Sequence, residues 1–176
     1  MAKLVPNNPL PQQTPVYYRP CVGVVLFNGE GRVWVGKRIS EPGNNLKFAW
    51  QMPQGGIDAG EDPAVAVLRE LQEETGTNNA TIIRESSRWF SYDLPANMRN
   101  ASKKGVFRGQ TQKWFALRFK GNDSEFKLDT HEKPEFSSWK WVGLEDVPEL
   151  IVPFKRGVYK NVVEEFKDLP ERIANE

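Results

Sequence analysis

The feature that most constrains this chain is an acid-rich helix framed by glycines, predicted over residues 63–75. Asp62 is a favourable N-cap residue, and Pro63 suits the first helical position, where a missing N–H costs nothing. Gly76 follows at the position where a left-handed glycine commonly ends a helix. These signals predict about three turns of helix, preceded by a tight turn that Gly55-Gly56 permits.

The two sides of this helix differ in polarity. At about 100° per residue, one arc is apolar and can face a core; it holds Ala64, Val67, Leu68 and Leu71. The neighbouring arc carries Glu70, Glu73 and Glu74. Like charges at i and i+4, as in Glu70 and Glu74, weaken a helix by about 0.2–0.5 kcal/mol, and only Arg69 offsets them. This arc is either a solvated acidic surface or a place where a cation sits among carboxylates.

The spacing of the polar and glycine residues favours the cation. It matches the pattern G-x5-E-x7-R-E-U-x-E-E-x-G-U, in which U is bulky and aliphatic, at Gly55, Glu61, Arg69, Glu70, Glu73, Glu74 and Gly76. This segment resembles the Nudix box, so the chain resembles the Nudix hydrolases. Leu71 fills the first U position. Thr77 occupies the last and is β-branched but polar, a departure that bears on local packing more than on catalysis.

Composition excludes several classes of protein. The 176 residues suffice for one domain with a core, and the net charge of +1 argues against broad wrapping of a DNA duplex. We find neither an apolar run approaching the ~18 residues of a membrane span nor a signal-peptide core. The single Cys21 excludes an internal disulfide and fits a buried thiol in a reducing cytoplasm, a reactive thiol being the alternative. We expect a cytoplasmic protein without a membrane partner, of undetermined oligomeric state.

The chain divides into three expected regions: a flexible Pro-rich tail over 1–14, a single domain over 15–168 and a fraying end over 169–176. Apolar patterning predicts strands within the domain at 21–27, 32–38, 80–83, 87–92, 112–119 and 139–142. A second amphipathic helix is predicted over 154–167. Strands, a helix, more strands and a helix predict an α/β fold with a mixed sheet between helices. This agrees with the α/β/α sandwich that the Nudix resemblance implies.

A cluster of hard oxygen ligands suits Mg²⁺, or Mn²⁺, and disfavours zinc. Such an ion, held by a few carboxylates with water and substrate phosphates, suits hydrolysis of a phosphoanhydride. We therefore expect Glu70, Glu73 and Glu74 to be metal ligands and catalytic residues, with one of them, or a nearby carboxylate, taking the proton of the attacking water. Arg69 is expected to orient Glu73, although an ordinary helix pair would look the same.

Segments beyond the box resemble the branch that contains bacterial RNA pyrophosphohydrolases and plant-type diadenosine tetraphosphate hydrolases. These segments lie at 18–23, 50–56, 110–115 and 133–159. The resemblance implies a fourth metal carboxylate, Glu135, which on its own would look like a loop residue. It also implies phosphate contacts from Arg19, Arg38, Gln54, Gly55, Lys113 and Lys155. Tyr92 and Phe154 are candidate base-stacking residues, with a place in the core as the alternative for each.

Two activities of this branch compete. The first removes pyrophosphate from a 5′-triphosphate RNA end and leaves a monophosphate. The second cleaves diadenosine tetraphosphate asymmetrically to ATP and AMP. The Pro-rich tail and the GGIDAGEDP version of the box favour the first. A third alternative, a non-catalytic nucleotide-binding Nudix module, is opposed by the intact acid set, and a purely structural domain would leave that set unexplained.

Overall fold

The structure, a computed structural model, describes residues 18–39, 48–99 and 107–176, so the expected tail over 1–14 lies outside the described residues. The strands are β1 (Tyr18–Phe27), β2 (Val33–Arg38), β3 (Trp50–Gln51), β4 (Gln54–Gly56), β5 (Ala80–Glu85), β6 (Phe90–Asp93), β7 (Gly109–Phe119) and β8 (Phe136–Val142). The helices are α1 (Pro63–Thr75), α2 (Ala96–Arg99), α3 (Val147–Leu150), α4 (Arg156–Phe166) and α5 (Leu169–Ala174). Within the described ranges, no helix is long and apolar enough to span a membrane.

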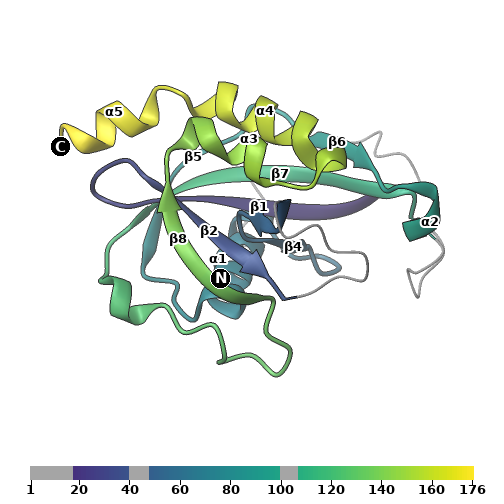
Figure 1. Cartoon of the computed structure of the whole chain (residues 1–176), viewed down its shortest axis with the longest axis horizontal. Coiled ribbons are helices and arrows are strands. Elements are labelled where there is room, and N and C mark those ends of the chain that lie inside the picture. The colour runs from purple at the N-terminus through teal and green to yellow at the C-terminus, as the bar shows by residue number, and fades with distance from the viewer. Residues whose placement is uncertain (1–17, 40–47, 100–106) are drawn as a thin grey trace, which may run out of the picture.

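The described strands form one mixed sheet whose centre is a parallel pair, β1 and β7 (Figure 1). Their register runs from Tyr18 opposite Gly109 to Phe27 opposite Arg118. The main path is β3-β2-β1-β7-β5, while β4 pairs with β1, β6 with β7 and β8 with β2. The other pairings are antiparallel. A central strand covered on both faces reads as a continuous apolar run, as β1 does.

Helices cover both faces of the sheet. On one face, α1 packs its buried Ala66, Val67 and Leu71 against a core that includes Val24 of β1 and Leu117 of β7. On the other face, α3, α4 and α5 lie together, as Figure 1 shows. There α4 contributes Tyr159, Val162 and Phe166 to a second core with Val25 and Trp114. This arrangement confirms the expected α/β fold with a mixed sheet between helices.

The C-terminal end differs from the expected fraying end. The segment Leu169–Ala174 is helix α5, and its Leu169 and Ile173 are buried in the same core as α4. Asp168 receives two hydrogen bonds from Arg84 of β5, of 2.7 and 2.8 Å, which fix the start of this helix. Two apolar residues at i and i+4 are too short a pattern to predict a helix, yet they suffice when a core is within reach.

Local hydrogen bonds also shift one strand boundary. A strand was expected over 87–92, but β6 begins at Phe90. Ser86 donates to the backbone oxygen of Arg88 at 2.8 Å and accepts from the backbone N–H of Trp114 at 3.1 Å, so this segment turns before the strand starts. Side chains of serine commonly compete with the sheet in this way.

Candidate active site

Helix α1 begins and ends as its sequence predicts. The Asp62 carboxylate accepts a hydrogen bond from the backbone N–H of Ala64 at 2.8 Å, and Pro63 opens the helix. Gly76 adopts a left-handed φ of 82°, and its N–H donates to the carbonyl of Gln72. The polar Thr77 is buried, and its hydroxyl reaches Glu125 at 3.1 Å, so the departure from an aliphatic residue is accommodated by a hydrogen bond.

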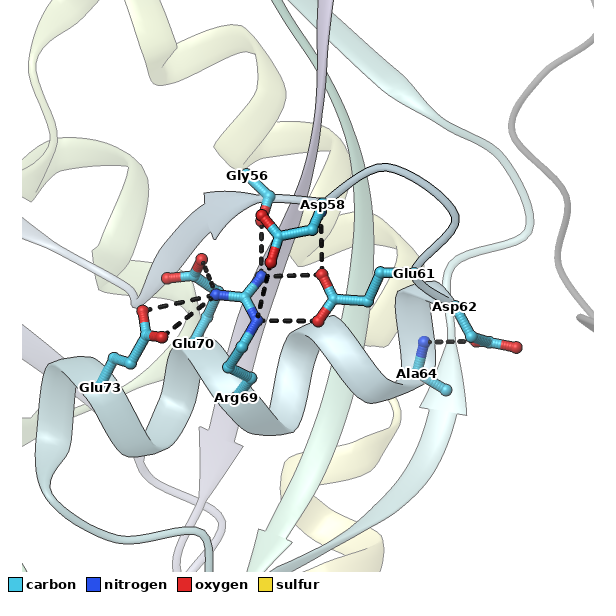
Figure 2. Close-up of polar contacts among 8 residues, drawn as sticks. All are labelled: Gly56, Asp58, Glu61, Asp62, Ala64, Arg69, Glu70 and Glu73. Atoms are coloured by element: carbon cyan, nitrogen blue, oxygen red, sulfur yellow. Dashed lines mark hydrogen bonds and ion pairs between the residues drawn. The ribbon is translucent and has the colours of Figure 1, made fainter.

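Arg69 connects the helix to the loop before it, as Figure 2 shows. Its guanidinium donates to both oxygens of Glu61, at 2.8 and 2.9 Å, and to the carbonyl of Gly56 at 2.9 Å. It also donates to Glu70 at 2.8 Å and, more weakly, to Glu73 at 3.3 Å. Arg69 was expected to orient Glu73, but its shortest contacts are with Glu61 and Glu70. These contacts hold the pKa of Glu61 below its usual range.

Three carboxylates meet at one cavity of about 420 Å³. Glu70 and Glu74 reach it from α1, and Glu135 reaches it from the residue before β8. The carboxylate of Glu74 accepts from the backbone N–H of Gln54 at 3.2 Å. Burial, followed by the charges of Glu135 and Glu70, raises the pKa of Glu74 well above its usual range. Burial also raises the pKa of Glu70, although Arg69 opposes the rise.

Glu73, the fourth expected ligand, lies beside this cluster and is not among the residues that line the cavity. Its side chain is 39% exposed and faces Arg69 (Figure 2). Within the described ranges, no three carboxylate, imidazole or thiolate side chains are already arranged to hold a metal ion by themselves. The role of Glu73 as a ligand therefore stays a prediction.

The residues present nevertheless suit Mg²⁺ or Mn²⁺. The donor set consists of carboxylate oxygens, which these hard cations prefer, and such ions keep several waters and substrate phosphates as ligands. Burial is the main cause of the raised pKa of Glu74, and repulsion from Glu135 and Glu70 adds to it. A cation among these side chains would remove that repulsion.

Gly55 and Gly56, where a tight turn was expected, instead lie in an extended strand and let two charged groups approach its backbone. A Cβ atom on Gly55 would lie 2.0 Å from the Glu70 carboxyl carbon, and one on Gly56 would lie 2.2 Å from the Arg19 guanidinium. Both glycines lie in β4, which pairs with β1 so that Gly56 is opposite Cys21 and Gly55 is opposite Val22. Glu70 and Arg19 therefore occupy the space that side chains at Gly55 and Gly56 would need.

Most of the predicted substrate contacts also line this cavity: Arg19, Arg38, Gln54, Gly55, Tyr92, Phe154 and Lys155. Lys155 is buried, with its ammonium 3.5 Å from Gln51 and 5.7 Å from the Tyr92 ring centre. The rings of Tyr92 and Phe154 lie 5.9 Å apart at 41°. Both also contact the core beneath α4, so the core alternative is confirmed for each residue, whereas base stacking stays a prediction.

Lys113 is the predicted phosphate contact that does not line the cavity. Side chains alternate along β7, and Trp114 faces the core beneath α4 whereas Phe115 faces the core beneath α1. Lys113 therefore shares the α1 face with Phe115, and it is buried there. The sequence could have indicated this, because Lys113 and Trp114 are neighbours in a strand and therefore point to opposite faces of the sheet.

Sequence reasoning gave no role to several cavity residues: Gln51, Leu94, Met98 and Gln110. Leu94 and Met98 come from the segment after β6, which Asp93 ties down through Tyr18, Arg99 and Arg108. Gln110 and Gln112 lie two residues apart on β7 and therefore share one face of the strand. That period of two was the signal that could have indicated a role for Gln110.

Comparison with known proteins identifies the family. A model of the NUDIX domain matches residues 17–162. A protein of Brucella abortus (strain 2308) named RNA pyrophosphohydrolase is 51% identical over 158 residues, which cover 86% of this chain and 89% of that protein. An Agrobacterium fabrum (strain C58) protein of the same name is 49% identical over 158 residues, which cover 86% of this chain and 93% of that protein.

Solved structures share the fold. The Escherichia coli dihydroneopterin triphosphate pyrophosphohydrolase aligns with a TM-score of 0.60 and 21% identity, covering 84% of this chain and 98% of that one. A Caenorhabditis elegans Ap4A hydrolase binary complex aligns with a TM-score of 0.59 and 20% identity, covering 90% and 99%. With the box geometry described above and a family model that matches most of its length, this chain belongs to the NUDIX domain family.

Proposed function

We propose that this chain hydrolyses a phosphoanhydride bond at the 5′ end of RNA, converting a triphosphate to a monophosphate with release of pyrophosphate. The observation that carries the proposal is one cavity that joins three carboxylates, three cationic side chains and two aromatic rings. These are Glu70, Glu74 and Glu135; Arg19, Arg38 and Lys155; and Tyr92 and Phe154. The relatives from Brucella and Agrobacterium, named RNA pyrophosphohydrolase, support RNA as the substrate.

The proposed cofactor is Mg²⁺, with Mn²⁺ as a substitute, held by Glu70, Glu73, Glu74 and Glu135. A bound ion of this kind neutralises phosphate charge and lowers the pKa of a coordinated water. The carboxylates of the chain would both hold the ion and include the group that takes a proton from the attacking water. Arg69 holds Glu70 at 2.8 Å, which limits its motion during the reaction.

The cationic side chains would hold the phosphates. Arg19 is seated against Gly56, and Lys155 is buried beside Gln51. Arginine offers paired donors that match phosphate oxygens, whereas lysine acts as a compact point charge. Gln54 and the Gly55 backbone lie at the same wall, and Lys113 is left out of this assignment because it does not line the cavity.

The aromatic pair would receive the base. Stacking of one base on an aromatic side chain contributes about 1–3 kcal/mol and tolerates different bases. Tyr92 and Phe154 lie at the cavity with Lys155 within 6.0 Å of the Phe154 ring centre. A single nucleotide with its phosphates is a substrate that a chain of net charge +1 can bind without an extended basic surface.

One competition assay tests this proposal. Purified protein with Mg²⁺ receives equal amounts of a short 5′-triphosphorylated RNA and diadenosine tetraphosphate, and the products are resolved together. We expect monophosphorylated RNA and pyrophosphate to form faster. Preferential formation of ATP and AMP would assign the alternative activity, and binding without cleavage of either would assign the non-catalytic one. Full turnover in excess chelator would overturn the metal requirement. Cytoplasmic localisation remains a prediction that goes with this substrate.

A further inference from the structure

A chain of hydrogen bonds runs from the core of the molecule to the cavity wall. The indole N–H of Trp114 donates to Oε1 of Gln112 at 3.1 Å, and both residues are buried. Nε2 of Gln112 donates to Oε1 of Gln54 at 3.1 Å and to Oε1 of Gln110 at 3.0 Å. Gln54 and Gln110 both line the cavity, whereas Gln112 and Trp114 lie behind it. The four residues form what we call the amide relay.

The donor and the acceptor of every hydrogen bond in the amide relay follow from one atom, the indole nitrogen of Trp114. An indole nitrogen only donates, so it must meet the oxygen of the Gln112 amide. That contact leaves Nε2 of Gln112, with its two hydrogens, for the two glutamines in front of it. Each of these receives a hydrogen on its oxygen, so each has its own –NH₂ group left to donate.

We propose that Gln112 is a positioning residue that holds the Gln54 and Gln110 amides with their N–H groups towards the cavity, where they donate to phosphate oxygens of the substrate. This inference rests on the proposed function and deepens it. An unrestrained glutamine presents its oxygen as readily as its nitrogen, because the two ends of the amide have nearly the same shape. Towards a phosphate, one orientation attracts and the other repels.

The amide relay fixes the orientation of the two wall amides, whereas Arg19, Arg38 and Lys155 supply positive charge. It is anchored in the core because Trp114 packs against Tyr159 at 5.5 Å and against Gly23, where a Cβ atom would lie 2.4 Å from the indole ring. The indole therefore has little room to rotate. With its single donor fixed in this way, the orientation of the two wall amides is fixed as well.

The first test replaces Gln112 by methionine, which keeps the length of the side chain and removes both of its polar groups. Binding of inorganic pyrophosphate, measured by calorimetry with Mg²⁺ present, is expected to weaken about tenfold. For RNA substrate we expect KM to rise and kcat to change much less. Unchanged pyrophosphate affinity and KM in folded Gln112→Met protein would overturn the proposal.

The second test reverses the direction of the amide relay. In Gln112→Glu the carboxylate accepts from Trp114 and from both wall amides, which would turn their oxygens towards the cavity. We expect weaker pyrophosphate binding than in Gln112→Met, and the difference should persist at high salt, where the added charge is screened. A difference that vanishes at high salt would overturn the assigned donor direction. This variant also serves if Gln112→Met does not fold.

The matched control is Thr111→Val. Thr111 is the buried neighbour on the other face of β7, where its hydroxyl bonds Ser91 at 3.0 Å. This variant loses a partly buried hydrogen bond without touching the relay, so its KM and pyrophosphate affinity should match the wild type. If the wild type binds pyrophosphate but leaves RNA uncut, only the proposed function fails, and the ratio of pyrophosphate affinities still decides the relay. Wild-type protein that does not bind pyrophosphate would overturn the relay proposal.

Discussion

At the scale of single residues, two glycines set the position of charges in the candidate active site. Gly55 leaves space for the Glu70 carboxylate and Gly56 leaves space for the Arg19 guanidinium. Neither glycine has a positive φ, so the backbone does not require glycine here. The requirement comes from the neighbouring side chains, and it can be tested without disturbing the fold.

Gly56→Ala should weaken substrate binding and leave stability nearly unchanged. The added methyl would meet the flexible tip of Arg19, which can move away at little cost to the fold but no longer sits at the cavity. Loss of one charge-assisted contact predicts a rise in KM of about tenfold. Gly157→Ala in α4 is the control, because a Cβ atom there meets nothing within 4 Å. Equal KM values for the two variants would contradict this account.

Cys21 should be chemically inert in the folded protein. Its side chain is fully buried in β1, and burial raises the pKa of the thiol to about 12, so the reactive thiolate is scarce. We expect no labelling by a thiol reagent under native conditions at about pH 8, and one label per chain in denaturant. Rapid native labelling would show that β1 opens or that the thiol is accessible.

At the scale of elements, Arg69 joins α1 to strand β4 and to Glu61. We expect Arg69→Lys to lower the free energy of unfolding by about 1–2 kcal/mol, since one ammonium cannot reach Glu61, the Gly56 carbonyl and Glu70 together. Arg84→Lys, at an ion pair with half-exposed Asp168, should cost less. Urea unfolding of both variants gives the comparison, and equal losses would argue against a special role for Arg69.

Helix α5 is a second element whose contribution can be measured. Ile173 is buried against the core beneath α4, so Ile173→Ala should lower the free energy of unfolding by about 2 kcal/mol. Glu171, two residues from it in sequence but exposed, provides the control, and Glu171→Ala should stay within about 0.5 kcal/mol of wild type. An Ile173→Ala variant as stable as wild type would mean that α5 does not dock in solution.

At the scale of the whole molecule, the buried carboxylates of the candidate active site lower the stability of the metal-free protein at neutral pH. The raised pKa of Glu74 means that the folded state binds more protons than the unfolded state above the ordinary carboxyl pKa. Without metal, the free energy of unfolding therefore falls as pH rises from the ordinary carboxyl pKa to the raised pKa of Glu74. The stabilising contribution of Glu74 is fully present only at or below the ordinary pKa. Glu74→Gln removes this dependence.

We expect Glu74→Gln to be more stable than wild type in chelator at about pH 7.5, with a smaller difference at about pH 5. Activity with Mg²⁺ should fall on the order of 100-fold or more, because the carboxylate is lost from the proposed metal site. Urea unfolding at the two pH values and a cleavage assay check both outcomes. A variant less stable than wild type at both pH values would contradict the repulsion described for this cluster.

What the sequence predicts well is local. The caps of α1 act within a few residues, so Asp62, Pro63 and Gly76 predicted its bounds. The apolar run over 21–27 likewise predicted a buried strand, which β1 is. The meeting of Glu70 and Glu74 at one cavity was predicted from their spacing, because residues at i and i+4 share one helix face.

What depends on distant pairing could not be predicted from the residues alone. Glu135 reaches the cavity because β8 pairs with β2, which brings the carbonyl of Glu135 to the N–H of Ile39. Before that pairing is known, only the family resemblance indicates a role for it. Gln112 acquires its role because Gln54, from a different strand, lies in front of it.

The parallel pairing of β1 with β7 also has a consequence for how the chain folds. β1 ends at Phe27, and its partner begins at Gly109, so the central ladder closes a loop over residues 28–108, a little under half of the chain. Contacts of such separation are costly to form early and slow folding. A ribosome-bound chain that has exposed only β1 to α1 already carries most of the acid cluster, but it lacks the strand that holds Gln110 and Gln112. The nascent protein therefore acquires its acidic residues well before it can assemble a phosphate-binding wall.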